Sequence, residues 1–423
     1  MSVTTLLFDR TRAEGMVRKI IHLMETKCIS LNGAHHNWRG MFAASLDDIC
    51  SSRTQQEFEG RVSEVLSRGG LSHVAFFHES GQRAPARYAI NATFMATDEA
   101  PPRWMFQDVH EGGPAYTAGI RPGDILLEAD GQQVRPPTVP PFSLGIDAEL
   151  LVEGVDERVR CVTVVLPKAD PSRRKGGTPP MAQPTAVTAR LLEGGVGYLK
   201  VAFFPGANGQ RFARELDAAL ASMPTRDRLI VDLRGNLGGF VGSLRLMSYL
   251  TPDRVPIGYS MTRAGQDRGL RKEQLVCLDR LPATTLDTLK MALRFKVLHR
   301  DRSVRLTTEG LGPKPFHGRV VMLINEHTSS AAEMVAAFAS EHRLATLVGT
   351  RTSGQVLGGA NFAVGDGFFV RLPAAGWYTW RGGMVEGVGV APDICVQVDA
   401  GNRFRTDPQL AAAHRIVRAE QIV

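Results

Sequence analysis

The sequence contains little that is typical of a disulfide-bonded, zinc-binding or membrane-spanning protein. Its five cysteines are scattered, odd in number and without a C-x-x-C pair, so they suggest neither a disulfide framework nor a zinc site. No stretch approaches the ~20 apolar residues of a membrane span, and the N-terminus lacks the basic segment and apolar stretch of a secretory signal. We therefore expect a cytoplasmic protein, or a periplasmic one if a leader has been removed.

The sequence also lacks any strong concentration of positive charge. The formal net charge is +7, but lysines and arginines are spread along the chain, with small clusters only at residues 173–175 and 300–305. This distribution argues against a nucleic-acid partner. The 423 residues suffice for about two to four domains without disulfides. The sequence leaves the oligomeric state open.

Residues 1–86 form the first of four regions that the patterns define. Apolar residues recur at helical spacing through most of this region, for example at Met16 and Ile20. A Gly-Gly pair then breaks the helical pattern, and the apolar residues 74–77 begin a strand. We expect a small helical region that ends in a strand preceded by a Ser-His pair.

Residues 87–167 change to short strands and turns. The segment EGGPAYTAGIRPGDILLEADGQQV, residues 111–134, resembles the PDZ family, with glycines at the tight turns and Ile-Leu-Leu in a strand. PDZ domains bind extended C-terminal peptides by strand addition and hold the terminal carboxylate in a backbone nest. The resemblance implies that this peptide-binding cradle comprises Ala89, Ile90, Asn91 and Ala92. Because this segment departs from the usual glycine-rich carboxylate loop, a structural or gating role for the domain remains the alternative.

Residues 168–185, rich in proline and glycine and with a basic triplet, are typical of a linker. Residues 186–423 then alternate strand-like and helix-like segments. Strands are expected near 196–204 and 229–233, and helices near 209–223 and 242–250. This alternation predicts an α/β layer architecture for the last region.

Ser330 is the most informative residue of that region. Five apolar residues at 320–324 predict a core strand, and residues 331–339 predict a helix that begins directly after Ser330. A hydroxyl at such a junction is rigidly held beside the free N–H groups of the helix start. The alternative is that the Ser/Thr cluster only caps the helix, since Ser330 followed by Glu333 has the spacing of a capping box.

A second segment, residues 229–240, has the sequence LIVDLRGNLGGF, a strand followed by a glycine-rich turn. A phosphate-binding loop is excluded, because no Gly-Lys-Ser/Thr follows and the G-x-G-x-x-G spacing is absent. Read alone, this segment is either a plain tight turn or a loop that brings backbone N–H groups to a ligand. Asp232 and Arg234 are expected to order the turn by pairing.

Four motifs in order reveal a family resemblance. They are DLRGNLGG at residues 232–239, NEHTSSAAE at 325–333, LVGTRTSG at 347–354 and GVGVAPDI at 387–394, all following the PDZ-like segment. This arrangement resembles the C-terminal processing (tail-specific) proteases and the related tricorn protease. The resemblance implies a ClpP/crotonase-like α/β core with an inserted PDZ-like domain, and Ser330 as the nucleophile.

The base predicted by the resemblance depends on one departure. Where the processing proteases have a lysine after a Gly-x-x-Thr-x-Gly turn, this chain has Gln355, which cannot accept the serine proton. The tricorn pattern instead implies a tetrad in which His73 is the general base for Ser330, Ser72 orients the imidazole and Glu386 completes the network. Two alternatives stay open, a displaced lysine such as Lys200 or Lys314, and a family member without activity.

Other residues compete for these roles. His78 ends the same strand as His73, but five residues separate them, so a regular strand would place them on opposite faces. Glu386 precedes a glycine-rich segment and could simply be solvated. The remaining candidate histidines are His35, His36 and His327.

The resemblance also implies an oxyanion hole made by a backbone N–H of Gly238 or Gly239 and by the N–H of Ala331. One such donor is worth ~3 kcal/mol to a tetrahedral intermediate. We therefore predict a serine endopeptidase that acts on peptides or unfolded proteins through an acyl-enzyme on Ser330, without metal or organic cofactor. The alternative is an inactive peptide-binding or scaffold member of the same family.

Overall fold

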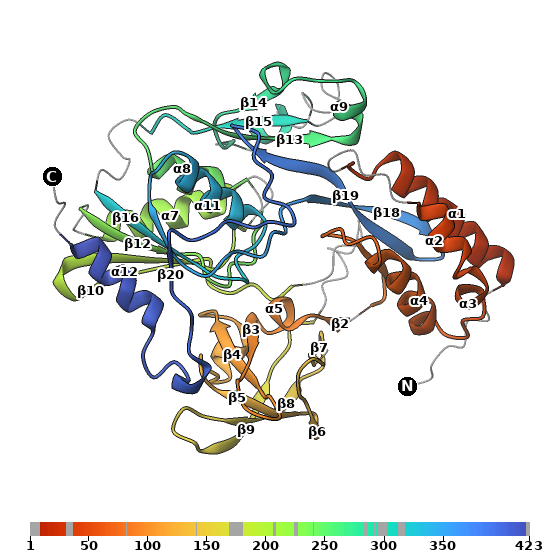
Figure 1. Ribbon diagram of the computed structural model, residues 1–423, viewed down its shortest axis with the longest axis horizontal. Helices are drawn as coiled ribbons and strands as arrows, with labels where there is room; N and C mark the ends of the chain where they lie inside the picture. Colours follow the sequence, from red (N-terminus) through yellow and green to blue (C-terminus); the bar gives the residue numbers. More distant parts are fainter. Residues whose placement is uncertain are drawn as a thin grey trace.

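The computed structural model describes residues 9–30, 37–81, 83–140, 142–168, 181–205, 209–223, 227–239, 241–282, 284, 286–290, 293, 303–311 and 318–419. Figure 1 shows three neighbouring parts, a helical N-terminal part in red, a β-rich part in orange and yellow, and a larger α/β part in green and blue. No helix among the described residues is both long and apolar enough to cross a membrane.

Four helices form the N-terminal part, as the apolar spacing predicts. They are α1 (Arg10–Thr26), α2 (Trp38–Ala43), α3 (Leu46–Cys50) and α4 (Gln55–Ser67). Their buried side chains, such as Phe42 and Phe58, pack in one cluster with Phe368 and Val370 from late in the chain. The helical region is therefore folded onto the C-terminal half.

A mixed sheet carries this connection. Its order is β1-β19-β13-β15-β14, and β18 pairs with β19. β1 runs antiparallel to β19, with Ala75 opposite Arg371. The strand after the Ser-His pair is thereby held in the same sheet as the C-terminal hairpin. The strands are β1 (Ala75–His78), β13 (Pro256–Thr262), β14 (Val276–Leu278), β15 (Val304–Thr307), β18 (Gly358–Gly365) and β19 (Phe368–Thr379), with α9 (Arg263–Asp267) and the 3₁₀ turn η3 (Lys272–Gln274) between them.

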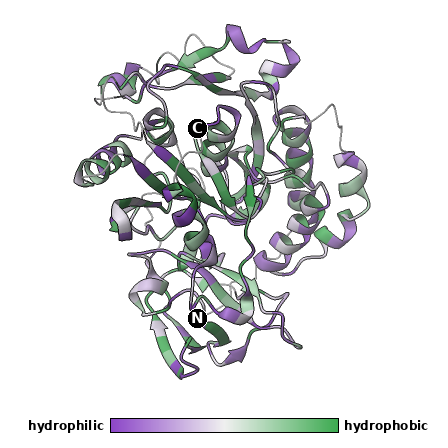
Figure 2. Ribbon diagram, turned by 60° about the vertical axis from the view of Figure 1, so that its left-hand side comes forward, coloured by the Kyte–Doolittle hydropathy of each residue, from purple (hydrophilic) through white to green (hydrophobic). Residues whose placement is uncertain are grey.

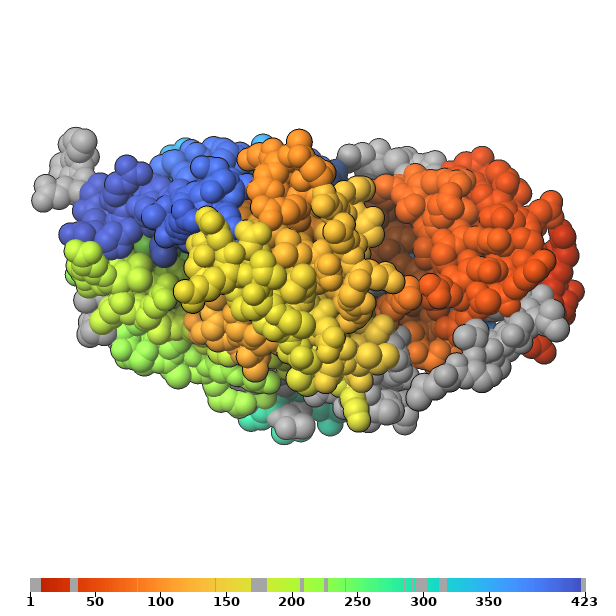
Figure 3. All heavy atoms as spheres, turned by 90° about the horizontal axis from the view of Figure 1, so that it is seen from below, coloured from red at the N-terminus to blue at the C-terminus, as the bar shows by residue number. Residues whose placement is uncertain are grey.

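The β-rich part begins where β2 (Arg83–Ala84) pairs with β7 (Phe142–Ser143). Its sheet has the order β3-β4-β5-β8-β9, with β6 paired to β5. The strands are β3 (Ala92–Ala96), β4 (Trp104–Val109), β5 (Ile125–Ala129), β6 (Gln132–Gln133), β8 (Ala148–Glu153) and β9 (Val159–Val164), and the short helices are α5 (Ala86–Ala89) and α6 (Pro114–Thr117). Seen from below in Figure 3, this PDZ-like part lies between the red N-terminal helices and the blue and green C-terminal part.

The α/β part is built on a sheet of order β10-β11-β12-β16-β17-β20. β10 is antiparallel to β11, and β11, β12, β16, β17 and β20 are parallel. The strands are β10 (Val187–Leu192), β11 (Val196–Val201), β12 (Arg228–Asp232), β16 (Arg319–Ile324), β17 (Thr346–Gly349) and β20 (Ile394–Cys395).

Helices cover both faces of this sheet. Leu229 and Val231 face α7 (Gln210–Ser222), α8 (Ser243–Tyr249) and α11 (Ala331–Glu341). Ile230, between them, faces α12 (Pro408–Arg418) on the other side. This alternation follows from the two-residue period of a strand, and Figure 2 shows the apolar strands between the helices. The 3₁₀ turns η2 (Glu193–Gly195) and η4 (Ala400–Asn402) complete the elements. The predicted α/β architecture with a β-rich insertion is confirmed.

Candidate active site

Ser330 lies in a sharp turn between β16 and α11. Its backbone has φ 57° and ψ −121°, a conformation that a residue with a side chain rarely adopts. Such strain costs of order 1–3 kcal/mol and persists only where the surroundings over-determine it. A strained strand-to-helix turn that projects a serine hydroxyl is the geometry of a nucleophile elbow. Ser330 is also the N-cap residue of α11, so the capping position and the candidate catalytic position coincide.

The glycine-rich turn after β12 packs directly against Ser330. A Cβ at Gly238 would lie 2.6 Å from the Cβ of Ser330 and 3.1 Å from its Oγ, so only glycine fits there. The Gly238 N–H donates to Asn236 Oδ1 at 2.8 Å. That N–H is therefore engaged, which corrects the expectation that Gly238 could serve as the oxyanion donor. Among the described residues, the N–H groups of Gly239 and Ala331 have no acceptor.

Asn236 holds the glycine-rich turn against the loop that carries Ser330, and the sequence patterns did not single it out. It is fully buried, its Nδ2 donates to Val201 O at 2.7 Å, and its carbonyl oxygen accepts the Ser329 N–H at 3.2 Å. One side chain and its backbone thus connect β11, the glycine turn and the serine loop. Its position within DLRGNLGG was the available signal, but the amide's role depends on contacts between distant segments.

Glu333 fixes a third segment against Ser330. One carboxylate oxygen, Oε2, accepts the N–H of Ser330 at 3.1 Å and that of Gln355 at 2.8 Å. The other, Oε1, accepts Thr352 Oγ1 at 2.6 Å and Gly354 N at 2.7 Å. Burial raises the pKa of Glu333, and these donors oppose that rise. The Gln355 carbonyl also accepts the Ser330 N–H at 2.9 Å, so Gln355 lies beside the candidate nucleophile.

His73 and its predicted partners approach from the start of β1. Ser72 Oγ lies 2.8 Å from His73 Nδ1. Glu386 Oε1 accepts the Ser72 N–H at 3.3 Å, and Glu386 Oε2 accepts the Val356 N–H at 2.8 Å. Glu386 is only 6% exposed, so the interpretation as a solvated side chain is wrong. Since Val356 follows Gln355, Glu386 connects the Ser72-His73 segment to the turn that contacts Ser330.

No hydrogen bond joins Ser330 Oγ to the His73 ring among the described residues. His73 itself has a positive φ of 59°, so both candidate catalytic residues have unusual backbones. Burial, reinforced by the positive charges of Arg371 and Arg87, lowers the pKa of His73 to about 4. The imidazole is consequently neutral at physiological pH, the form that accepts a proton.

The competing residues are engaged elsewhere. His78 contacts Ser80 Oγ at 2.7 Å through Nδ1 and Asp366 O at 3.0 Å through Nε2. His327 Nε2 lies 3.2 Å from Phe94 O and 3.1 Å from Gln107 Oε1. Lys200 pairs with Asp232 and donates to Arg234 O, which argues against it as a displaced base. The residues His35, His36 and Lys314 lie outside the described residues.

The PDZ-like part contacts the loop before Ser330 through β4. Asp108 accepts Asn325 Nδ2 at 3.0 Å, Gln107 donates to Glu326 Oε1 at 2.7 Å, and His110 Nε2 lies 2.9 Å from Gly235 O. Asn325 Oδ1 in turn accepts the Gly235 N–H at 2.9 Å. β4 therefore holds both the serine loop and the glycine turn, a connection that the sequence did not reveal.

The segment predicted to be the peptide cradle, Ala89–Ala92, is buried in this structure. All four residues are 0% exposed. Ile90 O accepts the Ala115 N–H and Asn91 O accepts the His110 N–H, both at 3.1 Å. Asn91 Nδ2 donates to Ala182 O at 3.0 Å. The segment therefore lies in the interior of the PDZ-like part, and nearby His327 contacts the carbonyl of Phe94 on the edge strand β3.

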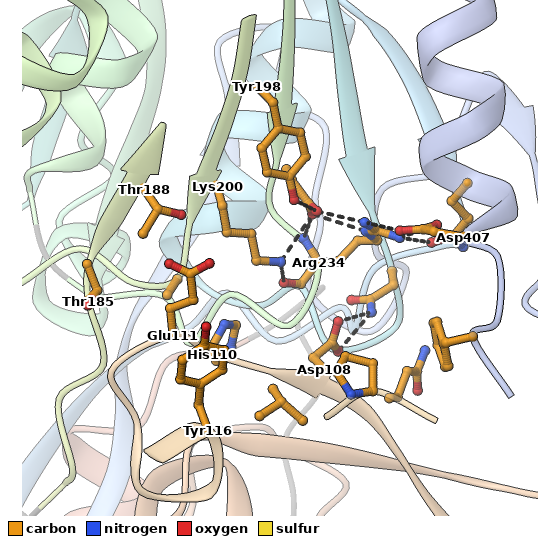
Figure 4. Close-up of a pocket in the computed structure, with 18 of the residues that line it drawn as sticks. Asp108, His110, Glu111, Tyr116, Thr185, Thr188, Tyr198, Lys200, Arg234 and Asp407 are labelled. Carbon is orange, nitrogen blue, oxygen red and sulfur yellow. Dashed lines mark hydrogen bonds and ion pairs between the residues drawn. The ribbon is translucent and has the colours of Figure 1, made fainter. Parts of the chain in front are cut away.

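A cavity of about 560 Å³ separates the PDZ-like part from the sheet, and its lining includes none of the predicted tetrad. Figure 4 shows Tyr198, Lys200 and Arg234 converging there. They meet at Asp232, which accepts Tyr198 Oη at 2.7 Å and Arg234 Nη2 at 2.7 Å. Burial alone would raise the pKa of Asp232, but Arg234 and Lys200 hold it well below its usual range. The expected Asp232–Arg234 pairing is thus confirmed as part of a larger cluster.

Comparison with known proteins supports the resemblance that the motifs indicate. Residues 195–396 match the model of peptidase family S41, and residues 105–139 match that of the PDZ domain. The chain is 29% identical over 362 residues to tricorn protease homolog 2 of Streptomyces coelicolor, covering 80% of this chain and 26% of that protein. It is 26% identical over 315 residues to a carboxy-terminal-processing protease of Bartonella bacilliformis, covering 69% of this chain and 58% of that protein.

Solved structures show the same fold. The photosystem II D1 C-terminal processing protease aligns with a TM-score of 0.56 at 15% identity, covering 96% of this chain and 97% of that one. Mature CPAF aligns with a TM-score of 0.55 at 14% identity, covering 96% and 97%. The chain therefore resembles family S41 peptidases in sequence over residues 195–396, matches a PDZ model over residues 105–139, and has the fold of these processing proteases, as the motifs predict. It spans less than two thirds of the length of the two sequence relatives.

Proposed function

We propose that the protein is a serine peptidase that hydrolyses peptide bonds through an acyl-enzyme on Ser330, with His73 as general base. The observation that carries the proposal is the chain of contacts from Ser330 through Gln355 and Val356 to Glu386, and on to Ser72 and His73. These contacts support a single centre that includes both ends of the predicted tetrad, which the PDZ domain separates in sequence.

The proposed first step forms a bond between Ser330 Oγ and the carbonyl carbon of the peptide. His73 Nε2 accepts the serine proton and passes it to the leaving amine as the C–N bond breaks. This requires the proton of the neutral imidazole to be on Nδ1, where Ser72 Oγ at 2.8 Å can accept it. Water, activated by the same imidazole, then hydrolyses the ester and regenerates the serine.

The oxyanion of the tetrahedral intermediate would accept hydrogen bonds from Gly239 and Ala331. The Gly239 N–H lies on the glycine-rich turn, and the Ala331 N–H lies at the start of α11. Neither has an acceptor among the described residues. Backbone donors of this kind are pre-oriented, so they stabilise developing charge without reorganisation.

An inactive binding protein of the same family is the second candidate. Gln355 in place of a lysine, and the lack of a direct Ser330–His73 hydrogen bond, favour it. Catalytic hydrogen bonds, however, often form only when substrate binds. The burial of the predicted peptide cradle, Ala89–Ala92, weakens this candidate.

Labelling with a fluorophosphonate probe distinguishes the two. A peptidase is labelled on one serine, and Ser330→Ala abolishes the labelling while His73→Ala strongly reduces it. Well-folded protein that remains unlabelled at every pH from 6 to 9 contradicts the proposal. Undiminished peptide hydrolysis by His73→Ala contradicts the assigned base.

A further inference from the structure

The strand β9 forms one edge of the PDZ-like sheet, and its outer side is open. It pairs with β8 alone, from Val159 opposite Glu153 to Val164 opposite Ala148, with no shift of register. Within the described part of the chain, no group outside this ladder hydrogen-bonds to the backbone of residues 159–164. Figure 1 shows β9 at the rim of the molecule, and the yellow region that includes it faces the viewer in Figure 3. The outward N–H and C=O groups of β9 are therefore available to another strand.

The side chains of β9 do not protect this edge. The residues that face outward are all uncharged, namely Val159, Cys161, Thr163 and, just beyond the strand, Val165. Val159 is 56% exposed and Val165 is 67% exposed. The charged residue of the strand, Arg160, is held by the buried Asp124 at 2.5 Å. Proteins usually protect a long edge with charge, proline, a bulge or a covering segment, because an open edge pairs readily with another strand.

The other edge strands in the described part of the chain are short, bulged, capped or covered. β14 has three residues, and β2, β6, β7 and β20 have two each. The register of β18 shifts twice. On β1 the His78 N–H donates to Glu59 at 2.8 Å, and on β3 the Phe94 carbonyl lies 3.2 Å from His327. β10 borders the cavity beneath the PDZ-like part. The six residues of β9 form a regular edge without these features.

The outward residues of β9 are complementary to a second copy of themselves. In an antiparallel pairing about a two-fold axis at Val162, Val159 of one copy lies opposite Val165 of the other, and Cys161 lies opposite Thr163. The two most exposed valines of this face then cover each other at both ends of the contact. Such directly opposed pairs are the contacts that stabilise an antiparallel sheet, and a two-fold axis repeats each of them.

The charges at the ends of β9 favour the same register. With the axis at Val162, Asp156 in the turn before β9 approaches Lys168 beyond its other end. An axis at Cys161 would instead place Val165 opposite Glu157. A shift that turns outward residues against inward ones is excluded by the two-residue period of a strand. The pairing about Val162 therefore joins apolar to apolar side chains and an acidic to a basic end.

We propose that β9 is the surface through which two copies of this chain associate, by antiparallel pairing that joins their PDZ-like sheets. Each strand would supply the main-chain hydrogen-bonding groups that the other lacks, as in other cases of strand addition. One strand per copy is a small contact beside the ~1,200–2,000 Å² of a stable interface, so we expect a reversible, concentration-dependent dimer. The loop before Ser330 contacts β3 and β4, toward the opposite edge of the sheet, so this association leaves the candidate active site free.

Sedimentation of the full-length chain over a concentration series tests the surface. We expect the wild type to pass from monomer to dimer as its concentration rises. The double variant Val159→Lys with Val165→Lys places two lysines opposite each other at both ends, and it should raise the dissociation constant by at least about 10-fold. Val159→Glu with Val165→Lys places opposite charges there instead. This second variant should restore the dimer and make it weaker at high salt.

Leu191→Lys is the matched control, because Leu191 is 48% exposed on β10, the other edge strand of six residues. It should leave the dissociation constant unchanged. Cross-linking tests the register. Thr163→Cys in a chain that keeps Cys161 should give disulfide-linked dimers under a mild oxidant, since the two thiols lie directly opposite each other. Thr163→Cys with Cys161→Ser should give none, because diagonal neighbours are about 7–8 Å apart, too far for a disulfide.

A wild type that remains a monomer over the whole concentration series overturns the inference. A dimer that survives the double lysine variant but is lost in Leu191→Lys also overturns it, and assigns the contact to β10. Cross-linking of the wild type through Cys161 alone contradicts the axis at Val162. Urea unfolding should show the wild-type free energy of unfolding for these surface variants, and the cross-linking result stands independently of the lysine substitutions.

Discussion

The Asp232 cluster and the His73 centre handle buried charge in opposite ways. At the cluster, Asp232 lies between Arg234, Lys200 and Tyr198, and all of these groups are paired. At the His73 centre, Arg371 and Arg87 have no carboxylate partner among the described residues, and the proposed base is neutral because its pKa is about 4. The difference teaches that direct ion pairing stabilises the buried charges of the cluster, whereas burial and nearby cations keep the histidine of the proposed centre neutral.

The largest expected effect separates chemistry from stability. Ser330→Ala should reduce kcat/KM by on the order of 10⁶-fold, the loss typical of a serine-protease nucleophile. The free energy of unfolding, measured by urea denaturation, should stay near that of the wild type, because the hydroxyl supports no buried charge. A stability loss comparable to that of a core variant would show that Ser330 is mainly a structural residue.

Asp232→Asn should have the reverse effect. Removing this carboxylate leaves Arg234 and Lys200 buried beside a neutral amide, and we expect the free energy of unfolding to fall by about 3–5 kcal/mol. Asp47→Asn is the control, since its ion pair with Arg10 is exposed and should contribute nothing measurable. Equal stability of the two variants would break the distinction between the paired cluster and an ordinary surface.

Acid should lower the free energy of unfolding through His110, which contacts Gly235 O near the paired cluster. Burial, helped by Lys200, lowers the pKa of His110 to about 4, whereas an unfolded histidine has a pKa of about 6.5. Between these values the unfolded chain binds the extra proton, so stability is full above pH 6.5 and declines as the pH falls toward 4, by about 3 kcal/mol for this histidine. His73 contributes in the same direction. Urea unfolding of His110→Gln across this range should show a shallower slope, and an unchanged slope would contradict the assignment.

Asp108→Ala tests the contact between the PDZ-like part and the loop that carries Ser330. It leaves the buried Asn325 amide without its acceptor, which should reduce the free energy of unfolding by about 1–3 kcal/mol. Because Asn325 begins the loop that carries Ser330, the rate of fluorophosphonate labelling of the folded protein should also fall. Asp124→Asn is the control, as Asp124 is buried and pairs with Arg160 within the PDZ domain. It should lower stability without slowing the labelling, and equal labelling rates in both variants would exclude a positioning role for β4.

Much of the fold was predictable because its signals are local. The apolar run at 320–324 and the helix after Ser330 are present as β16 and α11, and the four N-terminal helices follow the helical spacing. The PDZ resemblance is confirmed, but the segment predicted as its peptide cradle, Ala89–Ala92, is buried. That prediction used position within a family pattern, and the burial of this segment depends on the core that packs against it.

The sequence by itself determined the order of the motifs, the glycine that can approach Ser330, and the replacement of the expected lysine by Gln355. These are properties of single positions and short segments, so residue type and spacing suffice to find them. Only the tertiary structure decided that Glu386 connects the Ser72-His73 segment to the Ser330 turn, that β4 holds the serine loop, and that Arg371 and Arg87 have no carboxylate partner within the described part of the chain. Such features depend on distance and burial between segments far apart in the chain, which residue order does not encode locally.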